Sequence, residues 1–531
     1  PPPVFNDTAT TEIYTVENNL SLHDALPICL EKSTMVVLPT GMGKTVIAML
    51  VIADIYKKYP DKKILFLAPT KPLVEQHARY IKEHSLIEPV IVLTGEVSPK
   101  KRAKLWNDAK IFATTPQVIK NDIEADRITL KDVSLIIYDE AHRGVGRYSY
   151  VKINEYYKQQ NPEPHTLGIT ASPGSERERI ESVCKALGLD YFEARTEKDS
   201  DVAPYIQKAE LKFVDVELPI PIAEAVEKLK QLKLRKLQSL VESGLLITRK
   251  PLHYISMKDI LECNNRIRAA LLQNKGSAYF NAASICAQLM KLNSILDIAE
   301  SQGYESLVHK FEEIEEKAVS KEASKADKIL VKEPEIVEAM NIIRRKDIYN
   351  PKLELTLKII LTEIENKKDA KFIVFTQYRD TADTITATLA QHEPKIRPIR
   401  FVGQATKGED KGLTQKEQVE ILSKFRNNIY NVLVATSVAE EGLDIPSTDT
   451  VIFYEPVPSE IRNIQRRGRV ARTRPGKIIV LKVKGTRDQA YLYSSIKKEK
   501  KMRAYLRDLK TEKTIEKKTV KKTGQTTLFD Y

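Results

Sequence analysis

Two series of short apolar segments, separated by a long block that lacks them, constrain the fold of this chain most strongly. The first series has five runs rich in aliphatic and β-branched residues, each ending in turn residues, with amphipathic stretches between them. Such alternation of strand and helix predicts a parallel sheet with crossover helices. The runs are MVVLP (35–39), KILFLAP (63–69), KIFATTP (110–116), SLIIYDE (134–140) and TLGITAS (166–172).

The second series predicts another α/β domain of the same type. Because ligands of open parallel sheets bind at the carboxyl ends of the strands, we expect a site in the cleft that two such sheets can form. The runs are KFIVFTQ (371–377), IRFVG (399–403), NVLVATS (431–437), TVIFYEP (450–456) and KIIVLKV (477–483).

The block between the two series has a helical pattern. The apolar residues of 226–240 share one helical face, with lysines and an arginine interleaved, and residues 294–319 predict two helices on either side of Gly303. Residues 1–27 lack helical periodicity and the features of a signal peptide. We therefore expect a foreign or disordered segment at 1–27, α/β domains at 28–216 and 349–492, a helical insertion at 217–348 and a basic tail at 493–531.

Charge narrows the class of partner. The 531 residues carry a net charge of +13, which suits a polyanion such as nucleic acid or, second, an anionic membrane surface. Residues 497–522 hold twelve basic and four acidic side chains, so the tail is either a solvated or disordered segment or a further phosphate contact. No uninterrupted apolar stretch approaches the ~18 residues of a membrane span. The four cysteines fit no zinc spacing or disulfide framework, which leaves the cytoplasm as the expected compartment.

The segment LPTGMGKT (38–45) follows a predicted strand and precedes an apolar helix, as a phosphate-binding loop requires. Glycines allow backbone amides to approach phosphate, and the helix N-terminus adds its positive dipole. Lys44 would pair with the β- and γ-phosphates, and Thr45 would ligate Mg²⁺. The predicted nucleotide contacts in this loop are Thr40, Gly41, Met42, Gly43, Lys44 and Thr45.

An acidic pair ends the strand SLIIY. We expect Asp139 to contact Mg²⁺, directly or through water, and Glu140 to orient or deprotonate the attacking water. Thr170 and Ser172 end the next strand, where their hydroxyls either bond the acidic pair and couple nucleotide state to domain contact, or simply cap the strand. We expect His142 to act with Thr170 and Ser172 as a coupling residue.

The second domain carries a basic motif, QRRGRVAR (465–472). Arginines three apart on a helix face the same way, so Arg469 and Arg472 either reach a γ-phosphate across a cleft, with Gln465 beside them, or form an exposed basic helix. In ATSVAEEGLD (435–444), hydroxyls and amides suit a sugar–phosphate backbone. Gly442 and Asp444 of that segment are candidate nucleotide contacts, Asp444 for the ribose or the arginines.

These motifs, in this order, resemble the superfamily 2 helicases. The resemblance covers residues 28–490 and extends to the archaeal Hef helicases, relatives of the Fanconi anaemia group M helicase. It rests on APTKPLVEQH (68–77), LTGE (93–96), TTPQ (114–117), DEAHR (139–143), LGITASPGS (167–175), FVGQA (401–405), VLVATSVAEEGLD (432–444), FYEPVPSEIR (453–462), IQRRGRVAR (464–472) and KGTRDQAY (484–491).

The resemblance implies two RecA-like domains that grip ATP and Mg²⁺ between them, with a thumb-like helical insertion. It implies an ATP-dependent 3′–5′ DNA helicase or translocase that remodels forks and Holliday junctions in DNA repair. The insertion would contact duplex near the branch, with the lysine-rich helix at 226–240 as candidate or merely a solvated face. The implied DNA-path residues are Thr70, Lys71, Thr94, Gly95, Thr115 and Gln117 in the first domain and Thr376, Tyr378, Arg379, Gly403, Gln404 and Thr436 in the second.

The sequence departs from the family at both ends. The aromatic–glutamine motif that reads adenine upstream of the phosphate loop is missing, and no nuclease signature follows the helicase motifs. Gln525–Tyr531 resembles a sliding-clamp peptide that lacks its second aromatic, or is a polar tail. Two other functions stay open, namely a double-stranded RNA-activated translocase like RIG-I and Dicer, and a nucleic-acid clamp without productive turnover.

Overall fold

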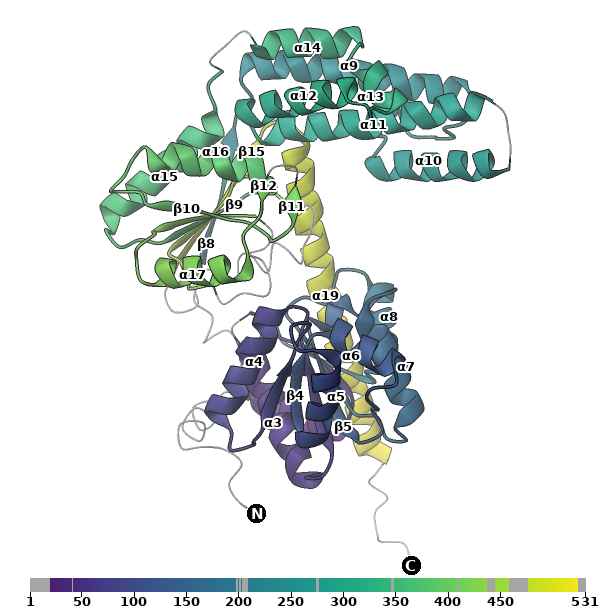
Figure 1. Ribbon diagram of the computed structural model, residues 1–531, viewed down its shortest axis with the longest axis vertical. Coiled ribbons are helices and arrows are strands. Elements are labelled where there is room, and N and C mark those ends of the chain that lie inside the picture. Colours follow the sequence, from purple (N-terminus) through teal and green to yellow (C-terminus); the bar gives the residue numbers. More distant parts are fainter. Residues whose placement is uncertain are drawn as a thin grey trace, which may run out of the picture.

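The computed structural model describes residues 20–40, 42–196, 199, 202, 209–273, 277–344, 348–407, 410–436, 445–457 and 476–523. It contains two parallel sheets flanked by helices, and an all-helical domain that lies against the second of them (Figure 1). The predicted fold class, two α/β domains of RecA-like type with a helical insertion, is confirmed.

The first sheet has seven strands in the order β3-β4-β2-β5-β6-β1-β7, and every neighbouring pair is parallel. All five predicted strands are present, and β3 and β7 are additional. The strands are β1 (Thr34–Val37), β2 (Lys63–Leu67), β3 (Val90–Leu93), β4 (Ile111–Thr114), β5 (Val133–Asp139), β6 (Thr166–Thr170) and β7 (Tyr191–Ala194). The helices around it are α3 (Lys44–Lys58), α4 (Lys71–His84), α5 (Pro99–Asp108), α6 (Pro116–Glu124), α7 (Ser149–Gln160) and α8 (Arg177–Leu187).

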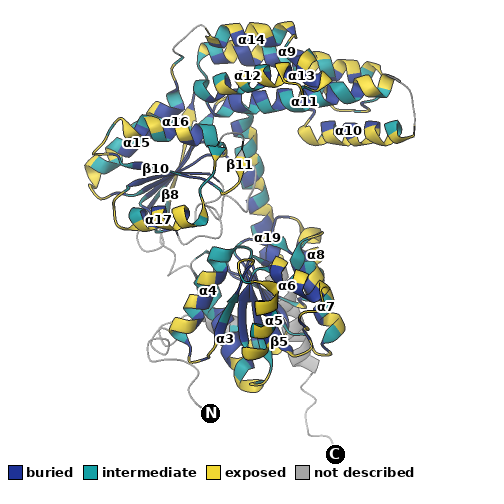
Figure 2. Ribbon diagram, in the orientation of Figure 1, coloured by how far each residue is buried: buried dark blue, intermediate teal, exposed yellow. Residues whose placement is uncertain are grey.

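The central strands are buried and mostly apolar because helices cover both faces of the sheet (Figure 2). Side chains alternate between the faces, so Leu65 packs into one core cluster while the adjacent Phe66 packs into the other. This double burial fixes the register of each strand. It also sets where each carboxyl end, and the loop that follows it, emerges from the sheet.

The second sheet has six parallel strands in the order β10-β13-β9-β14-β15-β8. The strands are β8 (Ala209–Val216), β9 (Phe372–Phe375), β10 (Pro398–Phe401), β13 (Val432–Ala435), β14 (Thr450–Phe453) and β15 (Gly476–Val483), with α15 (Pro351–Asn366), α16 (Arg379–Ala390) and α17 (Gln415–Arg426) around them. A two-stranded ribbon, β11 (Thr406–Lys407) with β12 (Asp410–Lys411), lies beside it.

Strand β8 corrects the predicted boundary at residue 216. We expected residues 28–216 to form the first domain, but β8 pairs with β15 along its whole length, as in Ala209 opposite Gly476 and Val216 opposite Val483. The second domain therefore begins its sheet before the insertion and completes it afterwards. The insertion is thus held to the second domain by both of its ends.

The insertion consists of helices and the turns between them, with no strand among the residues of 217–348 that the structure describes. Its helices are α9 (Ile220–Glu242), α10 (Met257–Leu272), α11 (Ser277–Ser301), α12 (Tyr304–Val319), α13 (Lys325–Leu330) and α14 (Pro334–Arg344). Gly303 separates α11 from α12, as predicted, with a φ of 105° that favours glycine. None of the helices in the described part of the chain is both long and apolar enough to cross a membrane.

The first 27 residues do not all lie outside the fold. Helix α2 spans Leu20–Glu31, and from Leu26 on its side chains pack against the core on one face of the first sheet. Pro27 lies inside this helix, and the segment before it lacks a regular apolar period, which is why the sequence did not predict it. The expected boundary at residue 28 is therefore too late.

The basic tail is a docked helix over much of its length. Helix α19 (Arg487–Thr523) begins at the end of β15 in the second domain and runs to the first domain (Figure 1). Met502, Tyr505 and Leu506 lie in a core cluster of the first domain and are 4%, 9% and 4% exposed. For these residues the expected alternative of a solvated or disordered run at 497–522 is wrong, because an apolar stripe is embedded among the basic side chains, while the alternative of a phosphate contact stays a prediction.

Candidate nucleotide and nucleic-acid site

The phosphate loop connects β1 to α3. Gly43 caps α3 with φ 80° and ψ 20°, a left-handed conformation that glycine adopts at little cost. The backbone N–H of Leu38 donates to the carbonyl of Thr170 at 3.2 Å, which joins the start of the loop to the end of β6. The ammonium of Lys44 donates to the carbonyls of Leu38 at 3.0 Å and Pro39 at 3.3 Å, so it lies against its own loop. Thr40, Met42 and Thr45 are partly exposed beside it.

The acidic pair lies at the carboxyl end of β5. Asp139 is 6% exposed, and one of its carboxylate oxygens accepts the backbone N–H of Glu140 at 3.0 Å. Glu140 has φ 49° and ψ 48°, a left-handed conformation that costs a non-glycine residue on the order of 1 kcal/mol and often occurs at functional sites. The hydroxyl of Tyr150 donates to the Asp139 carbonyl at 2.7 Å. The turn is therefore held from several sides.

The three coupling residues meet at the end of β6, where the hydroxyl of Thr170 caps the strand end, which was one of the two predicted alternatives. Nδ1 of His142 lies 2.9 Å from the hydroxyl of Thr170, and the backbone N–H of Ser172 donates to the same hydroxyl at 3.2 Å. Thr170 thus bonds the histidine that follows the acidic pair rather than the acids themselves. Ser172 donates its own hydroxyl to the sulfur of Met502 on α19 at 3.2 Å.

The carboxyl edge of the first sheet divides into two halves. Nucleotide candidates follow β1, β5 and β6, which are neighbours in the sheet, and helix α3 packs on β5 and β6. The DNA-path candidates follow β2, β3 and β4, which form the other half of the edge apart from β7. The boundary between the halves runs between β2 and β5, which pair directly.

Three loops carry the DNA-path candidates of this domain. Thr70 and Thr115 are the N-cap residues of α4 and α6, and the hydroxyl of Thr70 is buried without a hydrogen-bond partner among the described residues. Lys71 pairs with Glu96 at 2.6 Å, and this hydrogen bond raises the pKa of the lysine. Thr94 is 5% exposed, whereas Gly95 in the loop after β3 and Gln117 in the first turn of α6 are exposed.

The second sheet also carries DNA-path candidates at its carboxyl edge. Its DNA-path candidates follow β9, β10 and β13, which are adjacent. Arg379 donates to Asp410 at 2.9 Å and to the carbonyl of Gly403 at 3.0 Å, and Gln404 is exposed next to that glycine. The backbone N–H of Thr436 donates to the carbonyl of Phe401 at 3.1 Å.

Two of these candidates face the insertion. Thr376 has no exposed surface, and its hydroxyl donates to Gln302 at 3.3 Å, so its side chain does not fit a direct contact with DNA. Tyr378 packs against the core of the insertion, and burial raises the pKa of its hydroxyl. These residues instead connect the second sheet to the insertion.

The motifs of both domains match known helicase families. The DEAD/DEAH box helicase family matches residues 23–180, and the helicase conserved C-terminal domain matches residues 351–474. The crystal structure of the Pyrococcus furiosus Hef helicase domain matches this structure with a TM-score of 0.67. The match covers 91% of this chain and 98% of that chain, and the two sequences are 40% identical. The chain belongs to the Hef helicase family.

Curated relatives of this Hef-type chain are longer than it is. A Methanocaldococcus jannaschii protein, whose name describes it as a candidate ATP-dependent RNA helicase, is 40% identical over 90% of this chain and 59% of its own length. The ATP-dependent DNA helicase MPH1 of Pyricularia oryzae is 34% identical over 86% of this chain and 43% of its own. Fancm of Drosophila melanogaster, named as a DNA helicase, is 30% identical over 91% of this chain and 34% of its own.

Several predicted site residues of this Hef-family chain lie outside the described residues. They are Gly41, Gly442, Asp444, Gln465, Arg469 and Arg472. Gln525–Tyr531, the predicted clamp peptide, also lies outside them. The roles assigned to all of these remain predictions.

Sequence patterns did not single out three residues that connect the site to its surroundings. His77 contacts Asp139, Gln302 accepts hydrogen bonds from Thr376 and Thr381 at 3.3 and 2.9 Å, and Met502 contacts Ser172. Each contact joins segments at least 62 residues apart in sequence. For Met502 alone there was a local signal, since Met502, Tyr505 and Leu506 have helical spacing.

Proposed function

We propose that this chain is the motor region of an ATP-dependent 3′–5′ DNA helicase or translocase that acts on forked and branched DNA. Its work would be the processing of replication forks and Holliday junctions in DNA repair. Similarity to the MPH1 and Fancm relatives, which are named as DNA helicases, supports the DNA substrate. The chain covers only 34–59% of the length of the curated relatives described above, so the substrates of a longer protein are part of this proposal.

The observation that carries the proposal is the division of the carboxyl edge of the first sheet. In the first sheet, phosphate-loop and acidic residues follow β1, β6 and β5, while the DNA-path candidates follow β2, β4 and β3. One sheet thereby carries both surfaces, with a single pair of neighbouring strands between them. A displacement at one surface reaches the other through a short, packed route, as a motor requires.

The residues present fit Mg²⁺ and ATP. Mg²⁺ takes one or two protein oxygens and keeps several waters, and here Thr45 and Asp139 would supply those oxygens. Oε2 of Glu140 is buried and lies 3.2 Å from Nδ1 of His142, and this carboxylate would receive a proton from water. When bound, the metal neutralises charge on the phosphates. Lys44 would exchange the carbonyls of its loop for phosphate oxygens.

The insertion offers a basic surface, although not at the predicted helix. On α9, the cations Lys228, Lys230, Arg235 and Lys236 pair with glutamates of α11, α14 and the turn before α14. These internal pairs neutralise the lysine-rich face. The helix at 226–240 is therefore a poorer phosphate contact than its sequence suggests.

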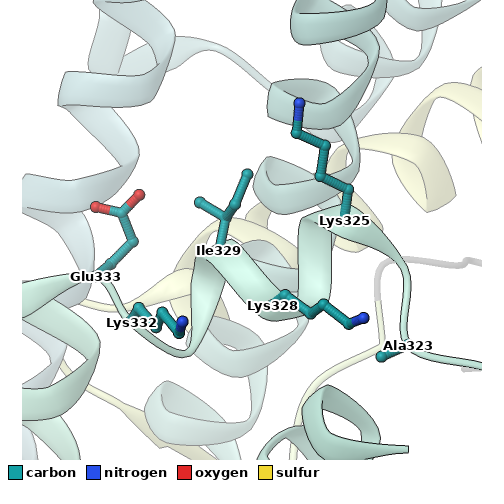
Figure 3. Close-up of a pocket in the computed structure, with 6 residues that line it drawn as sticks. All are labelled: Ala323, Lys325, Lys328, Ile329, Lys332 and Glu333. Carbon is teal, nitrogen blue, oxygen red and sulfur yellow. The ribbon is translucent and has the colours of Figure 1, made fainter. Parts of the chain in front are cut away.

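Helix α13 is the better candidate within the insertion. Lys325, Lys328 and Lys332 line a surface hollow of about 540 Å³ (Figure 3). Within the part of the chain that the structure describes, none of the three has an ion pair. Ammonium groups without acidic partners can release counterions when they meet phosphates. We propose that this cluster contacts the duplex arm of a fork.

A strand-displacement assay tests the function. Forks with a 3′ loading strand should be unwound in the presence of ATP and Mg²⁺, and forks with only a 5′ loading strand should not. Lys44→Ala should remove the activity and leave DNA binding intact. Unwinding by the Lys44→Ala variant, or unwinding that needs a 5′ strand, would overturn the proposal.

A second candidate is a translocase activated by double-stranded RNA. The name of the M. jannaschii relative, which refers to RNA, favours it. The same ATPase measured with duplex RNA separates the two candidates. Stimulation by duplex RNA and not by forked DNA would replace the first candidate by the second.

A further inference from the structure

His77 lies on the buried face of helix α4, which begins at the DNA-path candidates Thr70 and Lys71. The other buried residues of this helix, Val74, Ala78 and Ile81, are apolar, and His77 is 5% exposed. A buried polar side chain without a partner costs about 1–3 kcal/mol. Its partner is therefore informative about why a histidine stands there.

That partner is the acid proposed to hold the metal. Nε2 of His77 lies 2.9 Å from Oδ2 of Asp139, and the imidazole ring lies 4.3 Å from the ring of Phe66, between centroids. Nδ1 has no hydrogen-bond partner among the described residues. Because a carboxylate only accepts, Nε2 carries the hydrogen in this contact.

Hydrogen bonds to both carboxylate oxygens fix the orientation of the Asp139 side chain. Its Oδ2 is held by His77, and its Oδ1 accepts the N–H of Glu140 at 3.0 Å. Groups that hydrogen-bond a metal-ligating carboxylate fix its direction, and their loss typically costs about 10–100-fold in metal affinity or activity. His77 thus reaches from α4, in the DNA half of the sheet edge, to β5 in the nucleotide half.

We propose that His77 is a positioning residue that holds Asp139 in its metal-binding orientation. The nucleotide site then depends on a side chain supplied by the helix that starts at the DNA-path candidates. This inference rests on the proposed function, since it takes Asp139 as the Mg²⁺ ligand. The motif APTKPLVEQH (68–77) then has two roles. Thr70 and Lys71 are its DNA-path candidates, and His77, its last residue, positions the proposed metal ligand.

The test measures binding of a fluorescent ADP as Mg²⁺ is titrated, with an EDTA arm. His77→Phe keeps the ring against Phe66 and removes the donor, so half-maximal binding should require about 10-fold more Mg²⁺ while affinity in EDTA is unchanged. His77→Gln retains an amide donor near the place of Nε2 and should behave like the wild type. His84→Phe, at the far end of α4, is the matched control.

Two results would overturn the inference. One is a His77→Phe variant with wild-type Mg²⁺ dependence, and the other is a His77→Gln variant as defective as His77→Phe, because packing rather than the donor would then matter. If His77→Phe does not fold, His77→Asn replaces it, since its amide stops at the place of Nδ1 and should show the same Mg²⁺ defect.

Asp139→Asn separates this inference from the proposed function. If Asp139→Asn keeps the wild-type Mg²⁺ dependence, the proposed metal site is wrong and the inference falls with it. If Asp139→Asn loses that dependence while His77→Phe keeps it, the proposed function stands and the inference alone is wrong.

Discussion

The hydroxyl of Ser172 lies 3.2 Å from the sulfur of Met502, across 330 residues of sequence. Ser172 follows β6 of the first sheet, and Met502 lies on α19, which begins at the second sheet. The two α/β domains are therefore joined by a helix that packs into the core of the first, next to the nucleotide half of its sheet edge.

Truncation of Met502 should loosen this connection. Met502→Ala removes a side chain that is 4% exposed, and such core truncations cost about 2–5 kcal/mol. Hydrogen exchange in α19 and in β7, against which it packs, should become faster. Lys501→Ala, an exposed neighbour on the same helix, should change nothing measurable. Equal protection of α19 in the wild type and Met502→Ala would show that the docking contributes no stability.

The stability of the insertion should depend on pH through Lys233. Burial, with help from the charge of Arg487, lowers the pKa of this lysine from 10.5 to about 8 in the folded chain. Between those values the unfolded chain binds more protons than the folded one, so stability rises with pH from about 8 to about 10.5. Below about pH 8 the lysine is charged in both the folded and the unfolded chain, so its burial lowers the free energy of unfolding by a constant amount.

Lys233→Met should remove that penalty. Because the side chain is partly exposed, we expect a gain of only about 1 kcal/mol at pH 7 and a smaller rise in stability between pH 8 and 10.5. Thermal unfolding at both ends of this window, compared with Lys228→Met as an exposed control, checks the prediction. A variant that is less stable than the wild type at pH 7 would contradict it.

The three lysines on and just after α13 should contribute to fork binding. Replacing Lys325, Lys328 and Lys332 by alanine should weaken binding of forked DNA and reduce the slope of log affinity against log salt by about 0.9 for each DNA phosphate that these lysines neutralise. Lys228→Ala is the control, because this ammonium already pairs with Glu338 at 2.7 Å. An unchanged salt slope in the triple variant would place the duplex-binding surface elsewhere.

Removal of the Lys44 ammonium should stop the motor without releasing DNA. Loss of a charged group that stabilises the transition state costs about 10²-fold or more in turnover. Lys44→Ala should therefore lose ATP hydrolysis and keep its affinity for forked DNA, whereas Lys57→Ala, exposed in the last turn of the same helix, should keep both. Wild-type turnover in Lys44→Ala would exclude the loop as the phosphate site.

The buried central strands could be predicted from the sequence because they are apolar on both faces. Strand β8 could not, since most of its residues are exposed or half-exposed at the sheet edge and its partner β15 lies 267 residues later. Helix α19 was obscured by charge, because its three buried apolar side chains lie among many lysines. The local motifs therefore predicted the chemical groups of the site better than the contacts that join the site to the rest of the fold.

The sequence predicted those parts of the site whose functional side chains lie in one short segment. The phosphate loop and the acidic pair each occupy consecutive residues at a strand end. His77 and Gln302 act through contacts that exist only after folding, with Asp139 and with Thr376. The ion pairs of α9 likewise depend on α11, α14 and the turn before α14, so a basic sequence did not mean a free basic surface.

ATP hydrolysis by this chain, with forked DNA, single-stranded DNA, duplex RNA or no nucleic acid, tests the central claim most directly. A DNA-fork motor should hydrolyse ATP slowly alone and fastest with forked DNA. Stimulation by duplex RNA alone, or turnover that no nucleic acid changes, would contradict the account.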